Sequence, residues 1–345
     1  MHYPTFPKAC TSLLCKYFTP EVFEALKEKR TGFDFTVAQA INSGVENPDS
    51  GIGVYAGDEE SYEVFDLLFD PIIQEYHGFS KNQSHQSNLN PDELSTVNPD
   101  PEGEYIVSTR IRVGRNLKDF PLGPAIDKQS RLIAEKMISG ALSSLEGELK
   151  GEYYPLLGMS KEVQQDLIED HFLFKEGDRF LEAAGLNGNW PEGRGIYHNN
   201  DKTFLVWVNE EDQLRIISMQ EGGDIKEIFT RLTSAIKQLE KQLNFSYNKH
   251  LGYITSCPTN LGTAMRASVH IKVPRLAANM EKFKTITDRY HLQIRGIHGE
   301  HSQSEGGVYD ISNRRRLGIT EVDAVQDMID GVTALIAAEK ALENT

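Results

Sequence analysis

The stretch between residues 79 and 103 is the feature that most limits how this chain can fold. It has the sequence FSKNQSHQSNLNPDELSTVNPDPEG, which is polar, contains three prolines and offers few apolar side chains. Such a composition is typical of a linker, because it favours neither a regular helix nor a buried core. We therefore expect a linker over 81–103, which joins a domain of residues 1–80 to a larger domain of residues 104–345. A chain of 345 residues is long enough for two cores.

The first domain carries signals for helices. Thr19-Pro20 marks a helix start, since proline suits the first helical position, and apolar side chains follow on one face. We expect further helices over about 35–42 and over 61–78, the latter interrupted at Pro71. A loop rich in glycine and aspartate, NPDSGIGVYAGD, begins at Asn47.

The second domain mixes strands and helices. The segments EYIVSTRIRVGR and ASVHIKV alternate like strands, and TFLVWV, NEED and QLRIIS form a predicted hairpin. The segments KQSRLIAEKMISGALSSL and DIKEIFTRLTSAIKQLEKQL have the periodicity of amphipathic helices. This mixture predicts an α+β fold, in which helices cover one face of a largely antiparallel sheet.

The amino-acid composition limits which binding partners and which cellular compartment we expect for the protein. The formal net charge of −15 makes nucleic acid an unexpected partner. No apolar run is long enough to span a membrane, and the first ten residues lack the apolar core of a signal peptide. Three cysteines, Cys10, Cys15 and Cys257, are too few and too scattered for a disulfide framework. These features together predict a cytoplasmic protein with free thiols.

Arginines gather on or next to the predicted strands of the second domain. Arg110 and Arg112 are two residues apart, so they share one face of a strand, as do Arg266, Ser268 and His270. Taken singly, each arginine is more readily explained as a solvated surface charge. Together they require neutralisation, either by carboxylates or by a polyphosphate, and the planar guanidinium suits phosphate. The full set consists of Arg110, Arg112, Arg215, Arg266 and Arg295.

Common nucleotide and metal motifs are missing from the sequence. It contains no GxxxxGK[ST], no GxGxxG and no HExxH. The run His298-Gly299-Glu300-His301 is interpreted as part of a polar, glycine-rich loop rather than a metal site, because no third cluster of ligands is apparent. We therefore name no metal ligand in the protein.

Several motifs, in order, resemble the phosphagen (guanidino) kinases. They are STRIRVGRN, NEEDQLRIIS, CPTNLGT with RASVHIKVP, RGIHGEH and GGVYDISNRRRLG, and the resemblance covers essentially the whole chain. The resemblance implies a small helical N-terminal domain and a larger domain of antiparallel sheet flanked by helices. It also implies reversible transfer of the ATP γ-phosphoryl group to a guanidine nitrogen, with ATP or ADP and Mg²⁺ held mainly by the nucleotide and water.

The resemblance assigns roles to residues of this chain. Glu211, Cys257 and Glu300 would be catalytic and would hold the guanidinium, with Glu300 arriving on closure of a loop. The loop 47–57 would select the substrate. Its binding residues would be Ser50, Gly51, Ile52, Gly53, Val54 and Tyr55. The nucleotide would be bound by Ser108, Arg110, Arg112, His171, Trp207, Arg215, Arg266, Ser268, His270, Arg295 and Asp310.

The substrate loop resembles that of family members that phosphorylate arginine. Its backbone N–H groups would receive the α-carboxylate, and Tyr55 would contact the amino-acid end. Ile297 and His298 depart from the RGTRGEH typical of those members. Creatine, taurocyamine and lombricine remain alternative substrates, and a covalent-thiol enzyme or a non-catalytic nucleotide binder is a more distant alternative. Either a monomer or a homodimer fits the resemblance.

Cys257 has two interpretations. A free cysteine is usually a small buried apolar residue, but the context Ser256-Cys257-Pro258-Thr259 is polar. A neighbouring hydroxyl or N–H group would lower the thiol pKa and favour a thiolate. We therefore expect a thiolate that acts as an electrostatic partner of the guanidinium and not as a covalent nucleophile.

Overall fold

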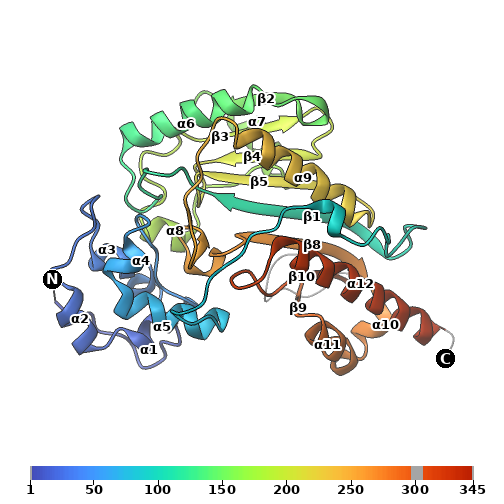
Figure 1. The fold of residues 1–345 in the computed structure, drawn as a ribbon, viewed down its shortest axis with the longest axis horizontal. Helices are drawn as coiled ribbons and strands as arrows, with labels where there is room; N and C mark the ends of the chain where they lie inside the picture. The colour runs from blue at the N-terminus through green and yellow to red at the C-terminus, as the bar shows by residue number, and fades with distance from the viewer. Residues whose placement is uncertain (1, 297–305, 344–345) are drawn as a thin grey trace.

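The computed structural model describes residues 2–296 and 306–343, and its N-terminal part is helical (Figure 1). The helices there are α1 (Leu13–Tyr17), α2 (Pro20–Leu26), α3 (Val37–Glu46), α4 (Ser61–Val64) and α5 (Asp66–His77). Side chains cap the first turns of α1, α2 and α3. The Thr36 hydroxyl accepts from the Gln39 N–H while the Gln39 side chain accepts from the Thr36 N–H, which is a complete capping box.

The helix interruption expected at Pro71 is wrong. The break falls at Phe65, whose φ of −108° and ψ of 33° separate α4 from α5, and Pro71 lies inside α5. A proline within a helix frees the carbonyl four residues earlier, which here belongs to Leu67. Because 48% of Leu67 is exposed, water can replace the missing donor.

An eight-stranded sheet forms the larger part, in the order β2-β3-β4-β5-β1-β8-β10-β9. Every neighbouring pair is antiparallel. The strands are β1 (Ile106–Arg115), β2 (Gly151–Pro155), β3 (Gly195–Asn199), β4 (Phe204–Val208), β5 (Leu214–Glu221), β8 (Met265–Lys272), β9 (Leu292–Gly296) and β10 (Val308–Asn313). The predicted hairpin across NEED is β4 and β5, so this prediction is confirmed.

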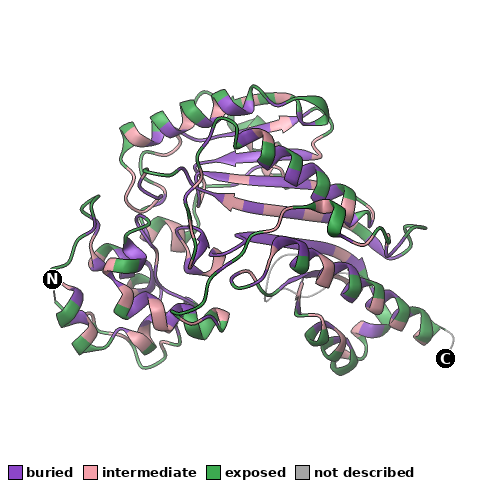
Figure 2. Cartoon of the chain, in the orientation of Figure 1, coloured by how far each residue is buried: buried purple, intermediate pink, exposed green. Residues whose placement is uncertain are grey.

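Three long helices cover one face of the sheet (Figure 1): α6 (Lys128–Leu142), α9 (Ile225–Leu239) and α12 (Glu321–Glu343). Apolar side chains of that sheet face, such as Ile111, Val113 and Val269, lie in one core with Phe229 of α9. Figure 2 shows the strands largely buried and the outer faces of the helices exposed. The α+β prediction is confirmed.

Short elements complete the described chain. They are η1 (Pro91–Glu93), η2 (Gly147–Leu149), α7 (Lys161–Glu169), α8 (Arg179–Ala183), β6 (Tyr247–Asn248), β7 (Gly252–Tyr253), η3 (Pro258–Asn260), α10 (Pro274–Ala277) and α11 (Met280–Arg289). Leu122, Leu251, Ile254, Leu261 and Leu317 join the core of the N-terminal helices, which packs the two parts together. No helix within 2–296 and 306–343 has the length and apolar character needed to cross a membrane.

The expectation that all three cysteines are free is wrong. Cys10 and Cys15 form a disulfide with a Cα–Cα distance of 6.3 Å, and Cys257 is the free thiol. Ser12 caps α1 by accepting from the Cys15 N–H, so the first helical turn brings Cys15 back towards Cys10. The cysteine count by itself therefore does not indicate a reducing compartment.

Candidate active site

The uncovered face of the sheet gathers the predicted nucleotide residues. Strand pairing places Arg112 opposite Arg266 and Arg110 opposite Ser268 on β1 and β8. Asp310 of β10 lies opposite both His270 and Arg295, and Trp207 of β4 lies opposite Arg215. Because paired residues of adjacent strands project to the same side, these side chains share one face.

A cavity of about 710 Å³ opens on this face. The predicted residues that line it are Ser108, Arg110, His171, Trp207, Arg266, Ser268, His270, Arg295 and Asp310. Apolar side chains from the segment 168–181, including Leu173 and Phe174, form another wall. Arg112 and Arg215 instead line a small cavity that shares Arg266 with the larger one.

The positive charges of the cleft arginines repel one another, which makes the protonated form of each less favourable. Burial and the neighbouring Arg215 and Arg266 lower the pKa of Arg110 to about 10. The pKa of Arg112 also lies well below its ordinary value, because of burial and the charges of Arg215 and Arg110. A concentration of positive charge in a partly desolvated cleft favours the binding of an anion.

Carboxylates neutralise only part of this charge. The Arg266 guanidinium donates to the Asp310 carboxylate at 2.7 Å, and His270 Nε2 lies 3.3 Å from the same group. These two partners lower the pKa of Asp310 against the effect of its burial. Arg215 pairs with Glu210 at 3.2 Å and with Glu211 at 3.0 Å.

Trp207 connects the arginines of the cleft. The guanidinium carbons of Arg110 and Arg215 lie 5.6 Å and 5.4 Å from the centre of its ring. Its indole N–H donates to the carbonyl of Phe172 at 2.8 Å. The ring is thereby fixed on the cavity wall, and it supports both cations through cation–π attraction.

Arg316 also belongs to the cleft, although no sequence motif singled it out. This residue lines the small cavity together with Arg112, Arg215 and Arg266, and it donates to the side chain of Asn260. Burial and the nearby arginines lower its pKa. Its two predecessors in the run NRRRLG pair outside this cavity, Arg314 with Asp288 and Arg315 with Asp327. A run of three arginines does not by itself indicate which of the three side chains lines the cavity.

Glu211 and Cys257 meet where the β4–β5 turn approaches the segment before η3. Asp212, a second residue that the sequence did not single out, holds them together. Its Oδ1 accepts from the Asn116 side chain at 2.8 Å and from the Ser256 N–H at 2.9 Å. The turn with Glu211 and the segment with Cys257 therefore share one buried carboxylate.

The environment raises the pKa of both groups. Burial raises the pKa of Glu211 to about 7, because desolvation outweighs the attraction of Arg215. Burial and the Glu211 carboxylate raise the pKa of the Cys257 thiol to about 12. The Thr259 hydroxyl lies 3.1 Å from the sulfur and lowers this pKa, but by less. Without substrate the Cys257 thiol therefore ionises less readily than an ordinary thiol, because its pKa is raised. The expected thiolate concerned the complex with a guanidinium and stays a prediction.

The loop with Ser50, Gly51, Ile52, Gly53, Val54 and Tyr55 reaches the same place. The N–H of Ala56, just after it, donates to the carbonyl of Ser256 at 2.8 Å. Burial raises the pKa of Tyr55, and the charges of Cys257 and Glu211 contribute. Glu300, Ile297 and His298 lie outside the described residues.

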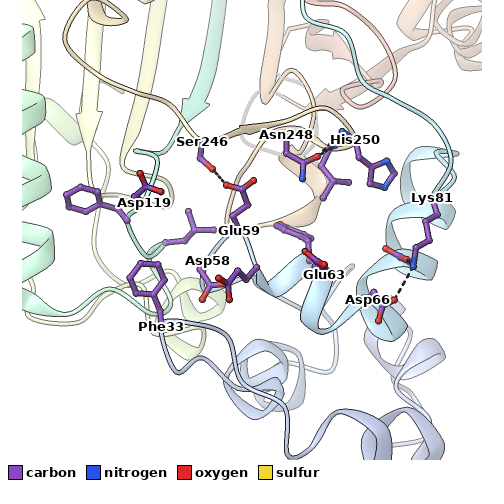
Figure 3. A pocket seen from close by; sticks show the side chains of 16 residues that line it. Phe33, Asp58, Glu59, Glu63, Asp66, Lys81, Asp119, Ser246, Asn248 and His250 are labelled. Atoms are coloured by element: carbon purple, nitrogen blue, oxygen red, sulfur yellow. Dashed lines mark hydrogen bonds and ion pairs between the residues drawn. The ribbon is translucent and has the colours of Figure 1, made fainter.

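A second cavity, of about 430 Å³, lies between the N-terminal helices and the segment 246–251 (Figure 3). None of the predicted site residues lines it. Its wall carries the carboxylates of Asp58, Glu59, Glu60, Glu63, Asp66, Asp70 and Asp119. Such a wall repels a polyphosphate. In the described part of the chain, no group of three or more His, Cys, Asp or Glu side chains is arranged to hold a metal ion.

Comparison with known proteins gives a consistent result. The profile of the ATP:guanido phosphotransferase C-terminal catalytic domain matches residues 133–342, and that of the N-terminal domain matches residues 8–74. The chain is 58% identical over 334 residues to arginine kinase Lit v 2.0101 of Penaeus vannamei, covering 96% of this chain and 94% of that protein. It is also 58% identical over 333 residues to an arginine kinase of Anthopleura japonica, covering 95% of this chain and 46% of that protein.

Solved structures agree with the sequence relatives. The substrate-free duplicated taurocyamine kinase of Schistosoma mansoni has a TM-score of 0.91 and 44% identity, covering 97% of this chain and 48% of that chain. A crystal structure of lombricine kinase has a TM-score of 0.92 and 40% identity, covering 99% of this chain and 95% of that chain.

Proposed function

The chain belongs to the ATP:guanido phosphotransferase family, and we propose that it transfers the ATP γ-phosphoryl group reversibly to the guanidino nitrogen of L-arginine, giving phosphoarginine and ADP. One observation carries this proposal most directly: Arg215 joins the arginine-lined cleft to Glu211, which lies beside Cys257. A site that binds anions thus adjoins a site that attracts a cation.

Catalysis at the phosphate side rests on fixed positive charge. A transferring phosphoryl group spreads its negative charge over its oxygens, and preorganised guanidinium groups stabilise that charge. Arg112, Arg215 and Arg266 line one small cavity, and Arg215 pairs with Glu211, so these arginines suit this task. Arg110, Arg295 and His270 line the larger cavity, where the rest of the nucleotide would lie. Mg²⁺ bound to the nucleotide would neutralise further charge on its phosphates.

Glu211 has the properties of a general base towards the guanidinium. A carboxylate with a pKa near 7 is matched to proton transfer at neutral pH. Paired hydrogen bonds to a carboxylate also orient the attacking nitrogen. Glu300 remains our proposal for the second carboxylate.

Cys257 acts as a charge partner once substrate is bound. A guanidinium beside the sulfur favours the thiolate, since an opposite charge in a desolvated site lowers a thiol pKa. The Thr259 hydroxyl at 3.1 Å is placed to stabilise that thiolate. The sulfur then orients the guanidinium without forming a bond to phosphorus.

The substrate loop is placed to receive the amino-acid end of arginine. No described residue accepts a hydrogen bond from the backbone N–H groups of Gly51, Ile52, Gly53 or Val54. Successive free N–H groups form a concave site for an anion, here the α-carboxylate. Tyr55 follows directly in the chain and precedes Ala56, whose N–H donates to the carbonyl of Ser256, the neighbour of Cys257.

The likeness to taurocyamine and lombricine kinases supports a second candidate, the same reaction on another guanidine. The identities of 40–44% to those structures are lower than the 58% to arginine kinases, which favours arginine.

A substrate panel tests the proposal. Purified protein with ATP and Mg²⁺ is mixed with arginine, taurocyamine, lombricine or creatine, and products are followed by phosphorus NMR. Phosphoarginine should form fastest, and Tyr55→Phe and Glu300→Gln variants should form it more slowly. If arginine is not phosphorylated while another guanidine is, the substrate assignment is wrong.

A further inference from the structure

The chain segment before and in the first turn of α1 packs directly against the substrate loop. The N–H of Leu13 donates to the carbonyl of Gly51, and the N–H of Leu14 donates to the carbonyl of Ile52, both at 3.0 Å. From the other side, the N–H of Gly44 in α3 donates to the carbonyl of Gly53 at 3.1 Å. Three consecutive carbonyl groups of the loop are therefore fixed.

Fixing these carbonyls also orients the N–H groups that follow them. Because a trans peptide unit is planar, the carbonyl of one residue and the N–H of the next point in opposite directions. The N–H groups of Ile52, Gly53 and Val54 are thus turned away from α1 and α3, and no described residue accepts from them. The hydrogen bonds from α1 and α3 preorganise the groups that would bind the carboxylate.

The contact leaves the loop little room to move independently. A Cβ atom added at Gly53, where φ is +82°, would lie 3.0 Å from Leu14 Cβ and 3.4 Å from Ser12 Oγ. A Cβ atom added at Gly44 would lie 2.4 Å from the carbonyl oxygen of Gly53. A displacement of the turn before α1 would therefore be transmitted to the loop.

The Cys10–Cys15 disulfide closes around this turn. Ser12 Oγ lies 3.5 Å from the sulfur of Cys10 and 3.3 Å from that of Cys15, and Ser12 itself is buried. Helix α1 has five residues, too few to be stable through its own hydrogen bonds. The disulfide restricts the turn, while both of its cysteines remain partly exposed and open to a reductant.

We propose that the Cys10–Cys15 disulfide is a redox-sensitive positioning element of the substrate loop. A dithiol reductant delivers two electrons and two protons, the S–S bond breaks, two thiols form, and the dithiol becomes a disulfide. Reduction frees the turn that holds Gly51 and Ile52, so the loop must be ordered when substrate binds. This inference rests on the proposed function, since it names the loop as the carboxylate site.

Steady-state kinetics on the full chain test the inference. Oxidised protein is compared with protein reduced by dithiothreitol, and the disulfide is verified by alkylation and intact mass. Reduction should raise the KM for arginine about three- to tenfold, because ordering the loop costs binding energy. The values of kcat and of the KM for ATP should stay within about twofold, which a general loss of structure would not allow.

Variants separate this disulfide from Cys257. Cys15→Ser should match the reduced wild type under oxidising conditions. The Cys10→Ser/Cys15→Ser double variant retains Cys257 and should not respond to dithiothreitol. A response that persists in the double variant would assign the effect to Cys257 and overturn the inference, as would an unchanged KM for arginine on reduction of the wild type.

Hydrogen exchange gives a readout that is independent of turnover. Reduction should speed exchange at the amides of residues 51–56 more than at those of β1, and unchanged rates would reject the coupling. Should the protein phosphorylate no guanidine in either redox state, the proposed function fails, while the exchange experiment still decides whether the disulfide holds the loop.

Discussion

The two halves of the site are built in different ways. The proposed nucleotide side stands on β1, β8, β10 and β9, where strand pairing places each side chain opposite a known partner. The proposed guanidine side consists of a turn, the segment before η3 and the loop 50–55, which are joined by single hydrogen bonds such as Ala56 to Ser256. The first half is built on the backbone of a continuous sheet, whereas the second half consists of separate loop segments held together by individual hydrogen bonds.

Their electrostatics are opposite as well. Burial and neighbouring arginines lower the pKa values of Arg110 and Arg112, whereas burial and Glu211 raise that of Cys257. Each half is therefore less stable without its ligand, one needing an anion and the other a cation. Under the proposed function, the two substrates together complete the charge balance of the site.

The largest effect is expected on the nucleotide side. Arg112→Gln should reduce turnover by about 10²- to 10³-fold, the loss typical of one preorganised donor. It should also raise the melting temperature without nucleotide, because a poorly compensated charge leaves the cleft. Activity and stability would thus change in opposite directions, as measured by a coupled assay and calorimetry.

Arg231→Gln is the matched control for that variant. Arg231 is 4% exposed on α9 and is bonded to Glu148, Ser218 and Gln220. Its loss should lower the melting temperature and leave turnover per folded molecule unchanged. If Arg112→Gln and Arg231→Gln change turnover and melting temperature in the same way, the proposal that the cleft arginines are preorganised for an anion is wrong.

The next effect concerns the thiol of the guanidine side. Cys257→Ser should reduce turnover by about 10²-fold, because a hydroxyl does not ionise to balance the guanidinium. Intact mass spectrometry during turnover should detect no phosphorylated enzyme. A phosphocysteine trapped in the wild type would show instead that the sulfur is a nucleophile.

A smaller effect is expected from pH. Since the pKa of Glu211 is about 7, the rate of phosphoarginine formation at low arginine should rise about tenfold between pH 6 and 8 as the base ionises. Glu211→Gln should abolish this limb of the pH profile along with most of the activity. A wild-type profile that is flat over this range would argue against Glu211 as the base.

The same group should affect stability with a defined sign. Its pKa in the fold exceeds the ordinary 4.5, so the folded state holds the proton more tightly than the unfolded chain. The resulting stabilisation is complete below pH 4.5 and is lost as pH rises through about 7. Glu211→Gln should therefore gain stability relative to the wild type at pH 8 but not at pH 4.

The smallest effect should come from Trp207→Phe. Phenylalanine keeps a ring beneath Arg110 and Arg215 but loses the hydrogen bond to Phe172. We expect the KM for ATP to rise about threefold, in line with a weakened cation–π contact, with little change in the KM for arginine. Equal changes in the KM for ATP and the KM for arginine would show that Trp207 does not act on nucleotide binding alone.

The two halves of the site also differ in how much of each could be predicted from the sequence. Alternation along STRIR places Arg110 and Arg112 on one face of their strand, and alternation along ASVHIKV does the same for Ser268 and His270, because the period of a strand is two. The pairing of β1 with β8, which brings these two faces to the same side of the sheet, is a feature of the tertiary structure. The guanidine side was recognised by its motifs, but its ionisation was not, since the pKa of Cys257 depends on burial and on Glu211. Arg316 was missed because its inward direction depends on Asn260 and on the cavity.

The sequence by itself determined the local features: the helices with their caps, the alternating strands, the hairpin and the motifs of the family. These follow from backbone preferences and from spacing within a few residues. Three other features depend on the tertiary structure: the first turn of α1 holds Gly51 and Ile52, Asp212 joins the Glu211 turn to Ser256, and burial with Glu211 raises the pKa of Cys257. Desolvation, charge and packing depend on groups distant in the chain, and the order of residues does not specify which of them meet.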